Sequence, residues 1–492
     1  FGIHTFRLVN AEGKSHFVKF HWKPLLGTHS ITWDEAVKIH GADTDFHRRD
    51  LWEAIDAGQY PEWELGFQIV PEEDEHKFDF DILDPTKLIP EEMVPVQRVG
   101  KMTLNRNPDN FFAETEQVAF HPGHVVPGID FTNDPLLQGR LFSYTDTQLS
   151  RLGSPNFHEI PINRPINETH NNQRDAHMRM TINKGKTAYF PNSIGGGCPH
   201  LAKMAEGGFT SYEERIDAKK VRARSESFND HYSQPALFYR SLTDWEKDHV
   251  ADAYTFELGK CTYDHIKERM LYIINNIDED LASKVAEGLG MEIPKKIDGP
   301  VNQAIGADDD VKKHQPGKKR NYLDKSEALS LTHLQSDSIA TRKIAFLVGD
   351  GFDGESMSKM KKALEDKGAM VQIVAPHGGT VKCDKGKDHK VDAAILTTES
   401  VLYDALYVPG GSKSVEALKK APKAPKIVNE TLKHCKAIAA DSGAMEFLKN
   451  TYLEDFKDDK AVLIDEKPAK FIKQIAAHRN WDRQKKVMDI PV

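Results

Sequence analysis

The chain has 492 residues, of which 39% are hydrophobic and 29% charged, so it is long enough for two or more globular domains. Its 66 basic and 75 acidic residues give a formal net charge of −9, which argues against a basic surface for nucleic acid or anionic membranes. No apolar run approaches the roughly 18 residues of a bilayer span, so we expect no membrane partner and, by default, a cytoplasmic location. The cysteines are widely spaced and indicate incidental thiols rather than a disulfide framework or a zinc site: Cys198, Cys261, Cys383 and Cys435.

The first part of the chain is predicted to form antiparallel strands and short helices. Apolar and polar residues alternate over 3–9 and 16–22, and the Asn-Ala-Glu-Gly sequence between them is typical of a turn, so a β-hairpin is expected. Short helices are expected at 35–40 and 49–57. Alternation resumes over 63–70, which predicts a half-buried strand.

The middle of the chain is predicted to combine irregular and helical segments. Prolines and glycines punctuate residues 90–165, which predicts little regular structure in a segment that is functional or wraps around a partner. Residues 166–227 are polar and rich in Asn, Arg and Gly, and we expect a loop there. Apolar residues recur at spacings of three and four from Gln234 to Leu289, which predicts a small helical domain. The charged, weakly apolar residues 291–341 are the expected linker.

Beyond the linker, the pattern changes to alternating strands and helices. A buried strand at 343–348, a helix at 357–367 and a second strand at 370–375 are predicted. Further strands are expected at 393–396, 405–408 and 437–440. This β/α alternation favours a doubly wound, flavodoxin-like domain.

One helical pattern carries the main chemical signal. Arg140, Tyr144, Gln148 and Arg151 would lie along one face of a helix. A free tyrosine keeps its proton until about pH 10, so an anionic tyrosine ligand needs a nearby cation, and Arg140 one turn earlier can supply it. Tyrosine is the rarer axial ligand of haem iron. Taken alone, the four residues favour an ordinary exposed amphipathic helix.

The flanking residues change that interpretation, because they resemble the proximal-helix region of monofunctional haem catalases. The resemblance rests on residues 127–140 (Pro-Gly-Ile-Asp-Phe-Thr-Asn-Asp-Pro-Leu-Leu-Gln-Gly-Arg) and 156–163 (Asn-Phe-His-Glu-Ile-Pro-Ile-Asn). It extends over almost the whole chain and is closest to the large-subunit catalases. It implies an α+β multidomain fold, in which a partial antiparallel catalase β-barrel with a wrapping loop and a helical domain is followed by the flavodoxin-like α/β domain.

The implied domains have the following bounds. Residues 1–104 are the C-terminal portion of the barrel, and 105–227 are the wrapping segment with the proximal haem helix. Residues 228–290 form the helical domain, 291–341 the linker, and 342–492 the flavodoxin-like domain. In catalases the wrapping segment lies between subunits, so the resemblance also implies a homotetramer.

The resemblance implies a haem cofactor, of b or modified d type, with Tyr144 as the axial ligand of the iron and Arg140 keeping it ionised. Arg151 could pair with a haem propionate. His121 matches a histidine that lies near the ligand tyrosine in large-subunit catalases, although it is also interpretable as an ordinary loop histidine. The other expected haem-binding positions are Phe120, Ile3, His4, Leu136, Ser143, Thr147 and Gln148. Of these, Ile3 and Leu136 are almost equally interpretable as plain core residues.

The implied reaction converts two molecules of hydrogen peroxide to water and dioxygen, in defence against oxidative stress. Cleavage of the O–O bond needs a distal acid/base. In the family, the distal histidine and asparagine lie upstream of the barrel residues that the start of this chain, residues 2–10, resembles. No histidine here matches that role by motif, so we expect this chain to supply the proximal side only. A haem-binding protein without peroxidase chemistry is therefore an alternative.

The C-terminal region contains a glycine motif that matches a dinucleotide-binding pattern in spacing but not in chemistry. Gly349-Asp-Gly-Phe-Asp-Gly354 has the spacing of a dinucleotide-binding loop. However, Asp350 and Asp353 would place negative charges where the pyrophosphate should lie, and no acid for a ribose follows the second strand. We therefore do not expect a dinucleotide here.

The same region resembles the class I glutamine amidotransferase-like superfamily, including its PfpI-type proteases. The resemblance rests on residues 406–411 (Leu-Tyr-Val-Pro-Gly-Gly) and 437–444 (Ala-Ile-Ala-Ala-Asp-Ser-Gly-Ala). That superfamily has a nucleophilic cysteine where this chain has Ser442, and a histidine where it has Gly443. Glu355 matches the acid of the family only in type and approximate place. Serine without a base is a poor nucleophile, so a catalytically silent domain is expected, and amide hydrolysis is a third hypothesis.

Overall fold

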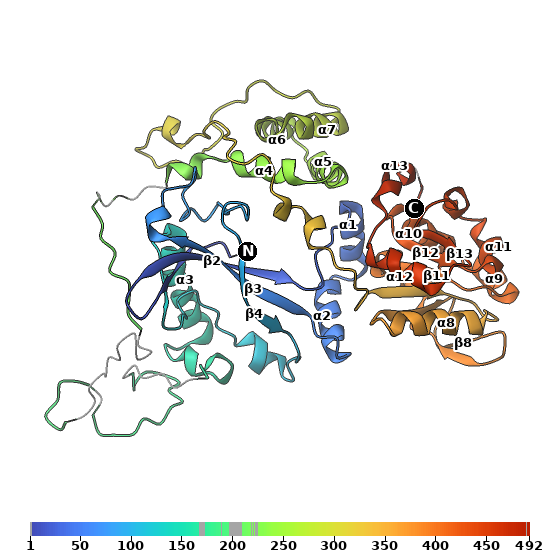
Figure 1. Cartoon of the computed structure of the whole chain (residues 1–492), viewed down its shortest axis with the longest axis horizontal. Coiled ribbons are helices and arrows are strands. Elements are labelled where there is room, and N and C mark those ends of the chain that lie inside the picture. Colours follow the sequence, from blue (N-terminus) through green and yellow to red (C-terminus); the bar gives the residue numbers. More distant parts are fainter. Residues whose placement is uncertain are drawn as a thin grey trace.

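The computed structural model describes residues 2–166, 173–187, 189–195, 209–217, 219, 221, 225–488 and 490–492 (Figure 1). Cys198 and part of the loop predicted at 166–227 lie outside the described residues. In the described part of the chain, no helix has both the length and the apolar composition needed to cross a bilayer.

The N-terminal region is built on a curled antiparallel sheet of five strands in the order β4-β3-β2-β1-β5. These strands are β1 (Phe6–Val9), β2 (Ser15–Pro24), β3 (Glu62–Pro71), β4 (Gln97–Thr103) and β5 (Ile129–Asp130). β1 and β2 pair antiparallel from Phe6 opposite Val18 to Val9 opposite Ser15. The predicted hairpin and the predicted strand at 63–70 are therefore confirmed.

Two helices connect β2 to β3, and they match the helices expected at 35–40 and 49–57. These are α1 (Trp33–Ala42) and α2 (Phe46–Asp56). The Thr32 side chain begins α1 by accepting a hydrogen bond from the backbone N–H of Glu35, which satisfies a donor that the first helical turn leaves free. Figure 1 shows both helices between the sheet and the C-terminal domain.

The segment from 90 to 165 contains more regular structure than its prolines and glycines indicated. It includes β4, a π-helical turn at Phe112–Glu116, β5 and the long helix α3 (Pro135–Leu152). The expectation of little regular structure is wrong for β4. The first five residues of β4 are exposed, so its sequence lacks the alternation of buried and exposed residues from which strands are predicted.

Four helices follow, as the apolar spacing predicted. They are α4 (Ser233–Ser241), α5 (Asp244–Gly259), α6 (Asp264–Ile277) and α7 (Glu279–Leu289), and their common core includes Leu271, Ile274 and Val285. Residues 291–341 contain only short 3-10 helices, at Val311–His314, Glu327–Leu329 and Leu331–Leu334.

The C-terminal region is a parallel sheet of six strands in the order β10-β7-β6-β11-β12-β13, with a small hairpin beside it. Its strands are β6 (Lys343–Leu347), β7 (Met370–Ala375), β10 (Ala393–Ala394), β11 (Ala405–Val408), β12 (Ala437–Ala440) and β13 (Val462–Ile464), and the hairpin pairs β8 (Thr380–Lys382) with β9 (Asp388–Lys390). Its helices are α8 (Gly354–Glu365), α9 (Ser412–Lys419), α10 (Lys423–Lys433), α11 (Met445–Leu448), α12 (Pro468–Ala476) and α13 (Gln484–Val487). All the strands predicted in this region are present, whereas β13 has only three residues and was not predicted.

Helices cover both faces of this sheet. Along β6, Ile344 and Phe346 pack in one apolar cluster with residues of α8 and α12. Ala345 and Leu347 pack in a second cluster with residues of α9 and α10. Successive strand residues point to opposite faces, so the continuous apolar run of β6 follows from burial on both sides.

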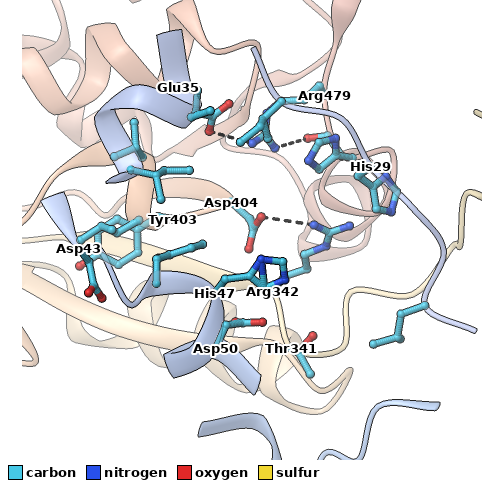
Figure 2. Close-up of a pocket in the computed structure, with 18 of the residues that line it drawn as sticks. His29, Glu35, Asp43, His47, Asp50, Thr341, Arg342, Tyr403, Asp404 and Arg479 are labelled. Atoms are coloured by element: carbon cyan, nitrogen blue, oxygen red, sulfur yellow. Dashed lines mark hydrogen bonds and ion pairs between the residues drawn. The ribbon is translucent and has the colours of Figure 1, made fainter. Parts of the chain in front are cut away.

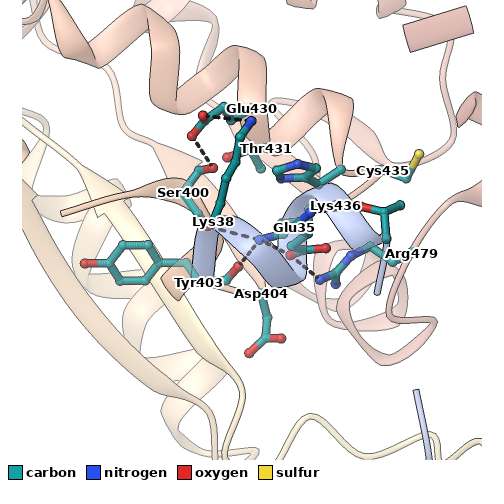
Figure 3. Close-up of polar contacts among 12 residues, drawn as sticks. Glu35, Lys38, Ser400, Tyr403, Asp404, Glu430, Thr431, Cys435, Lys436 and Arg479 are labelled. Carbon is teal, nitrogen blue, oxygen red and sulfur yellow. Dashed lines mark hydrogen bonds and ion pairs between the residues drawn. The ribbon is translucent and has the colours of Figure 1, made fainter. Parts of the chain in front are cut away.

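A buried ionic network joins α1 to the C-terminal domain (Figure 3). Glu35 accepts hydrogen bonds from Lys436 Nζ at 2.7 Å and from Arg479 Nη2 at 3.0 Å. All three side chains are almost inaccessible to solvent. Beside them, His434 Nε2 lies 3.0 Å from the Asp34 carboxylate. The two regions of the chain are thus joined by charges that neither could satisfy alone.

Two further contacts extend this junction. Lys343 at the start of β6 donates to Glu53 of α2 at 2.8 Å. Trp245 of α5 stacks on Trp481, with ring centroids 4.8 Å apart. The C-terminal domain therefore contacts both the helices next to the N-terminal sheet and the helical region.

Candidate functional site

The site predicted from the sequence is centred on α3, and a buried carboxylate fixes the start of this helix. Asp134 is the N-cap residue, and its side chain accepts hydrogen bonds from the backbone N–H groups of Leu136 and Leu137 at 2.9 and 3.0 Å. The other carboxylate oxygen lies 2.5 Å from His4 Nδ1. His4 is buried just before β1, so it ties α3 to the sheet.

Tyr144 and Arg140 interact one helical turn apart, as predicted. Arg140 Nη2 donates a hydrogen bond to the Tyr144 phenol oxygen at 2.7 Å, and its guanidinium carbon lies 4.8 Å from the centre of the Tyr144 ring. Arginine stays protonated at every physiological pH. The phenol oxygen therefore lies beside a permanent positive charge.

His121 lies next to Tyr144, with ring centroids 6.1 Å apart and ring planes 70° apart. Its Nδ1 accepts a hydrogen bond from the Gly123 backbone at 2.8 Å, so the ring proton of the neutral imidazole is on Nε2. Nε2 then donates to Thr145 Oγ1 at 2.7 Å. Partial burial lowers the pKa of His121, which favours this neutral form at neutral pH.

Gln148 and Arg151, at the C-terminal end of α3, hold the preceding segment of chain. The Gln148 amide donates to the Phe120 carbonyl at 3.0 Å. Arg151 donates to the carbonyls of Glu116 and Val118 at 2.7 and 2.5 Å, and to the Gln148 side chain at 2.7 Å. Its two terminal nitrogens are therefore engaged with protein atoms, and the pairing with a propionate stays a prediction.

The remaining predicted positions are exposed. Ile3 is 49% and Leu136 48% exposed, and Phe120 is 79% exposed, so none of the three is an ordinary core residue. Ser143 and Thr147 are exposed on α3. Leu136, Arg140 and Tyr144 follow each other at intervals of four residues, which places them along one side of the helix over about 12 Å.

These residues fit a haem group. A tyrosine oxygen is a known haem ligand. Here the Tyr144 oxygen accepts a hydrogen bond from Arg140, and the side chain is only partly buried. Exposed apolar side chains before β1 and on α3 could cover a flat apolar ring. The donor set and the apolar surface therefore agree with the expectation.

Three residues of this site were not predicted from the sequence. Asp134 is followed by Pro135, and an Asp-Pro pair is a recognisable helix start, so its capping role could have been predicted. Thr145 accepts the hydrogen bond from His121, and the His124 ring stacks on His121 with ring centroids 4.8 Å apart. No local sequence pattern predicts the role of either residue.

The loops of the C-terminal domain use their polar groups internally. Asp353 caps α8 by accepting from the N–H groups of Glu355 and Ser356, and Asp350 accepts from the Lys382 backbone at 2.8 Å. The Ser442 N–H donates to Asp465 at 2.7 Å, and Glu355 pairs with Lys385 at 3.0 Å. Within the described part of the chain, no histidine is hydrogen-bonded to the Ser442 hydroxyl.

Three family models match the chain: "Catalase" over residues 1–196, "Catalase-related immune-responsive" over 225–289, and "C-terminal domain found in long catalases" over 340–485. Among curated proteins, it is 52% identical over 498 residues to Catalase HPII of Pseudomonas putida, covering 100% of this chain and 67% of that protein. It is 48% identical over 491 residues to Catalase-2 of Bacillus subtilis, covering 98% and 68%. It is 46% identical over 499 residues to Catalase-B of Dictyostelium discoideum, covering 100% and 69%.

Proposed function

The chain belongs to the catalase family, in its long form with a C-terminal domain, and from this premise we propose that Tyr144 is the axial ligand of its haem. The observation that carries the proposal is the 2.7 Å hydrogen bond from Arg140 to the Tyr144 oxygen. It provides, in the folded chain, the positive charge that an anionic tyrosine requires.

The haem, when bound, supplies the iron redox chemistry by which two hydrogen peroxide molecules become two water molecules and one dioxygen. The residues of this chain prepare the proximal side. Arg140 donates a hydrogen bond to the Tyr144 oxygen and places its positive charge there, and the Asp134 cap fixes the helix that carries both. His121, with its proton directed to Thr145, packs beside the ligand ring. We assign the distal acid/base to no residue of this chain.

For the other haem contacts, we propose Ile3, Leu136, Phe120, Ser143 and Thr147, with His4, Gln148 and Arg151 holding the surrounding backbone. The exposure of the apolar members supports the first group, and the hydrogen bonds of the polar members support the second. The haem is of b or modified d type. A homotetramer and a role in oxidative-stress defence belong to the same proposal.

We further propose the division into domains at residues 104, 227, 290 and 341, with a flavodoxin-like C-terminal domain. Leaving out the two-residue β10, the parallel strands have the order 2-1-3-4-5 in this domain, which is that of flavodoxin. Its relation to PfpI-type proteins stays a proposal. The absence of a described histidine partner for Ser442 supports a catalytically silent domain. The described cysteines are free thiols, which favours a reducing location such as the cytoplasm.

The test is a haem titration followed by absorption, together with oxygen evolution from hydrogen peroxide, for the protein and its Tyr144→Phe variant. We expect the variant to lose the spectrum of a tyrosinate-bound haem and to bind haem at least about tenfold more weakly, because the proposed axial oxygen is removed. Tyr263→Phe is the matched control, since Tyr263 is 63% exposed at the start of α6. An unchanged haem spectrum in Tyr144→Phe would overturn the assignment.

A further inference from the structure

Lys19, in the middle of β2, differs from the other buried cations of the protein. Figure 2 shows one of these, Arg479, joined to the carboxylate of Glu35. In the described part of the chain, each of the other buried lysine and arginine side chains likewise has a carboxylate at 3.3 Å or less: Arg7, Lys87, Lys343, Lys436 and Arg483. Lys19 is 2% exposed and has no carboxylate partner among the described residues.

The ammonium group of Lys19 instead donates to two backbone carbonyls. Its Nζ lies 2.9 Å from the Ile3 oxygen and 3.3 Å from the Lys87 oxygen. Burying a charge without a carboxylate partner is costly in free energy, so the groups that this ammonium holds indicate its role. Of the two, Ile3 carries the apolar side chain that we propose as a haem contact.

The short segment before β1, which contains Ile3, is held residue by residue. The Gly2 N–H donates to a carbonyl of β2 at 2.6 Å, and His4 contacts the cap of α3 at 2.5 Å. The Thr5 carbonyl accepts a hydrogen bond from the segment before α3 at 2.6 Å. For Ile3, the hydrogen bond from Lys19 is the only one among the described residues. The Ile3 side chain is 49% exposed, so packing alone does not fix it.

Charged groups face Lys19 from several elements. They belong to the start of α3, the turn between β3 and β4, and the segment before β1: Asp134, Asp81, Asp84, Lys87 and His4. Burial lowers the pKa of Lys19 to about 8, although Asp134, Asp84 and Asp81 act in the opposite direction. Lys19 therefore keeps its proton at pH 7 and loses it in mildly alkaline solution.

We propose that Lys19 is a positioning residue for the haem, whose ammonium group holds the Ile3 carbonyl and thereby the apolar side chain that Ile3 presents to the ring. This inference rests on the proposed assignment of Ile3 as a haem contact. Lys19 is buried and acts through Ile3 alone. Hydrogen bonds from charged donors are roughly twice as strong as those from neutral donors, so deprotonation of Lys19 weakens the hold on Ile3.

The first test needs no haem. It is a pH titration of the Ile3 methyl group, followed by NMR in protein with isotope-labelled isoleucine methyl groups, and Ile3→Val identifies the signal. We expect the signal to move with a midpoint of about pH 8 and to stay in place in Lys19→Met, which keeps the apolar stem and removes the ammonium group. A signal that does not move across this pH range in the unaltered protein would overturn the proposal, even if Lys19→Met does not fold.

The second test is a haem titration at several pH values. At pH 7 we expect Lys19→Met to bind haem at least about fivefold more weakly. The ratio of the two affinities should fall as the pH rises through about 8, which a lysine with a merely structural role would not cause. Lys343→Met is the matched control, because Lys343 is another buried lysine and pairs with Glu53; its haem affinity should equal that of the unaltered protein. Equal haem affinity in Lys19→Met would contradict the proposal.

The outcomes separate this inference from the haem assignment. An unchanged haem spectrum in Tyr144→Phe would remove the axial ligand, whereas the Ile3 titration would still show whether Lys19 holds Ile3. Loss of that spectrum in Tyr144→Phe, together with unchanged haem binding in Lys19→Met, would remove the role of Lys19 alone.

Discussion

The Tyr144 oxygen accepts its hydrogen bond from a group that cannot lose its charge. Replacing Arg140 by glutamine keeps a donor near the phenol but removes the charge. A hydrogen bond to a charged group contributes about 1.5–3 kcal/mol, so Arg140→Gln is expected to weaken haem binding at pH 7 by about 10- to 100-fold. The measurement is a haem titration at pH 7, followed by absorption.

A graded series of substitutions gives the sharper test of this residue pair. Arg140→Gln removes the charge beside the phenol oxygen, so its haem affinity should be the weakest of the series. Arg140→Lys keeps the charge, so its haem affinity should lie between that of Arg140→Gln and that of the original protein. Arg106→Gln, which removes an exposed partner of Glu114, is the control. Equal haem affinity in Arg140→Gln and the original protein would show that the charge is unimportant.

At the scale of single residues, only contacts within one helix could be predicted from the sequence. Arg140 and Tyr144 are four residues apart, so helix geometry alone brought them together. His4 and Asp134 are separated by 130 residues, and no local pattern reports their contact. Arg151 has the chemistry for a carboxylate, yet in the structure its terminal nitrogens bind backbone carbonyls of a segment about 35 residues earlier.

At the scale of elements, α3 depends on its cap. Asp134→Ala removes the acceptor of two backbone N–H groups and the partner of the buried His4. We expect a loss of about 1–2 kcal/mol in the free energy of unfolding, together with weaker haem binding, because the start of the helix that positions Tyr144 is released. Urea unfolding and haem titration measure the two effects.

Asp353→Ala provides a matched control for the cap. Asp353 accepts the same pair of hydrogen bonds at the start of α8, but that helix belongs to the C-terminal domain. The Asp353→Ala substitution should lower the free energy of unfolding by a similar amount and leave haem binding unchanged. Equal haem affinity in Asp134→Ala and Asp353→Ala would mean that the α3 cap does not position the ligand.

The elements that were predicted correctly are those whose buried residues recur at a regular strand or helix spacing. β3 alternates, and α6 and α7 place their buried residues at helical spacing. β4 is mostly exposed and β13 has only three residues. Neither therefore shows the alternation of apolar and polar residues from which a strand is predicted. The Gly349–Gly354 motif matched a pattern whose chemistry was absent, since Asp353 caps the helix itself.

At the scale of the whole molecule, the Glu35 network joins the two regions. Burial opposes ionisation of Glu35, but Arg479 and Lys436 outweigh it and lower its pKa to about 2. Glu35→Gln would leave two buried cations without a carboxylate, which costs about 3–5 kcal/mol in comparable buried pairs. Thermal and urea unfolding at pH 7 measure the loss.

This network also predicts how stability depends on pH. The folded pKa of Glu35 lies below the unfolded value of about 4.3, so its contribution is complete above that pH and is lost as the pH falls toward 2. The difference between the protein and Glu35→Gln should therefore shrink between about pH 4.5 and 2. Glu446→Gln, at an exposed ion pair with Lys449, should show little difference at any pH. A difference that is constant with pH would contradict the ionic origin.

The shared charges have a consequence for how the protein unfolds. If the N-terminal region unfolded first, the C-terminal domain would be left with Lys436 and Arg479 lacking their counter-charge. If the C-terminal domain unfolded first, Glu35 would be left without either cation. Each region therefore makes partial unfolding of its neighbour unfavourable. Although two sheets and separate apolar cores are present, the junction should couple them into a single cooperative unit in the sense of calorimetry. Selection for stability in one region would then act on residues of the other.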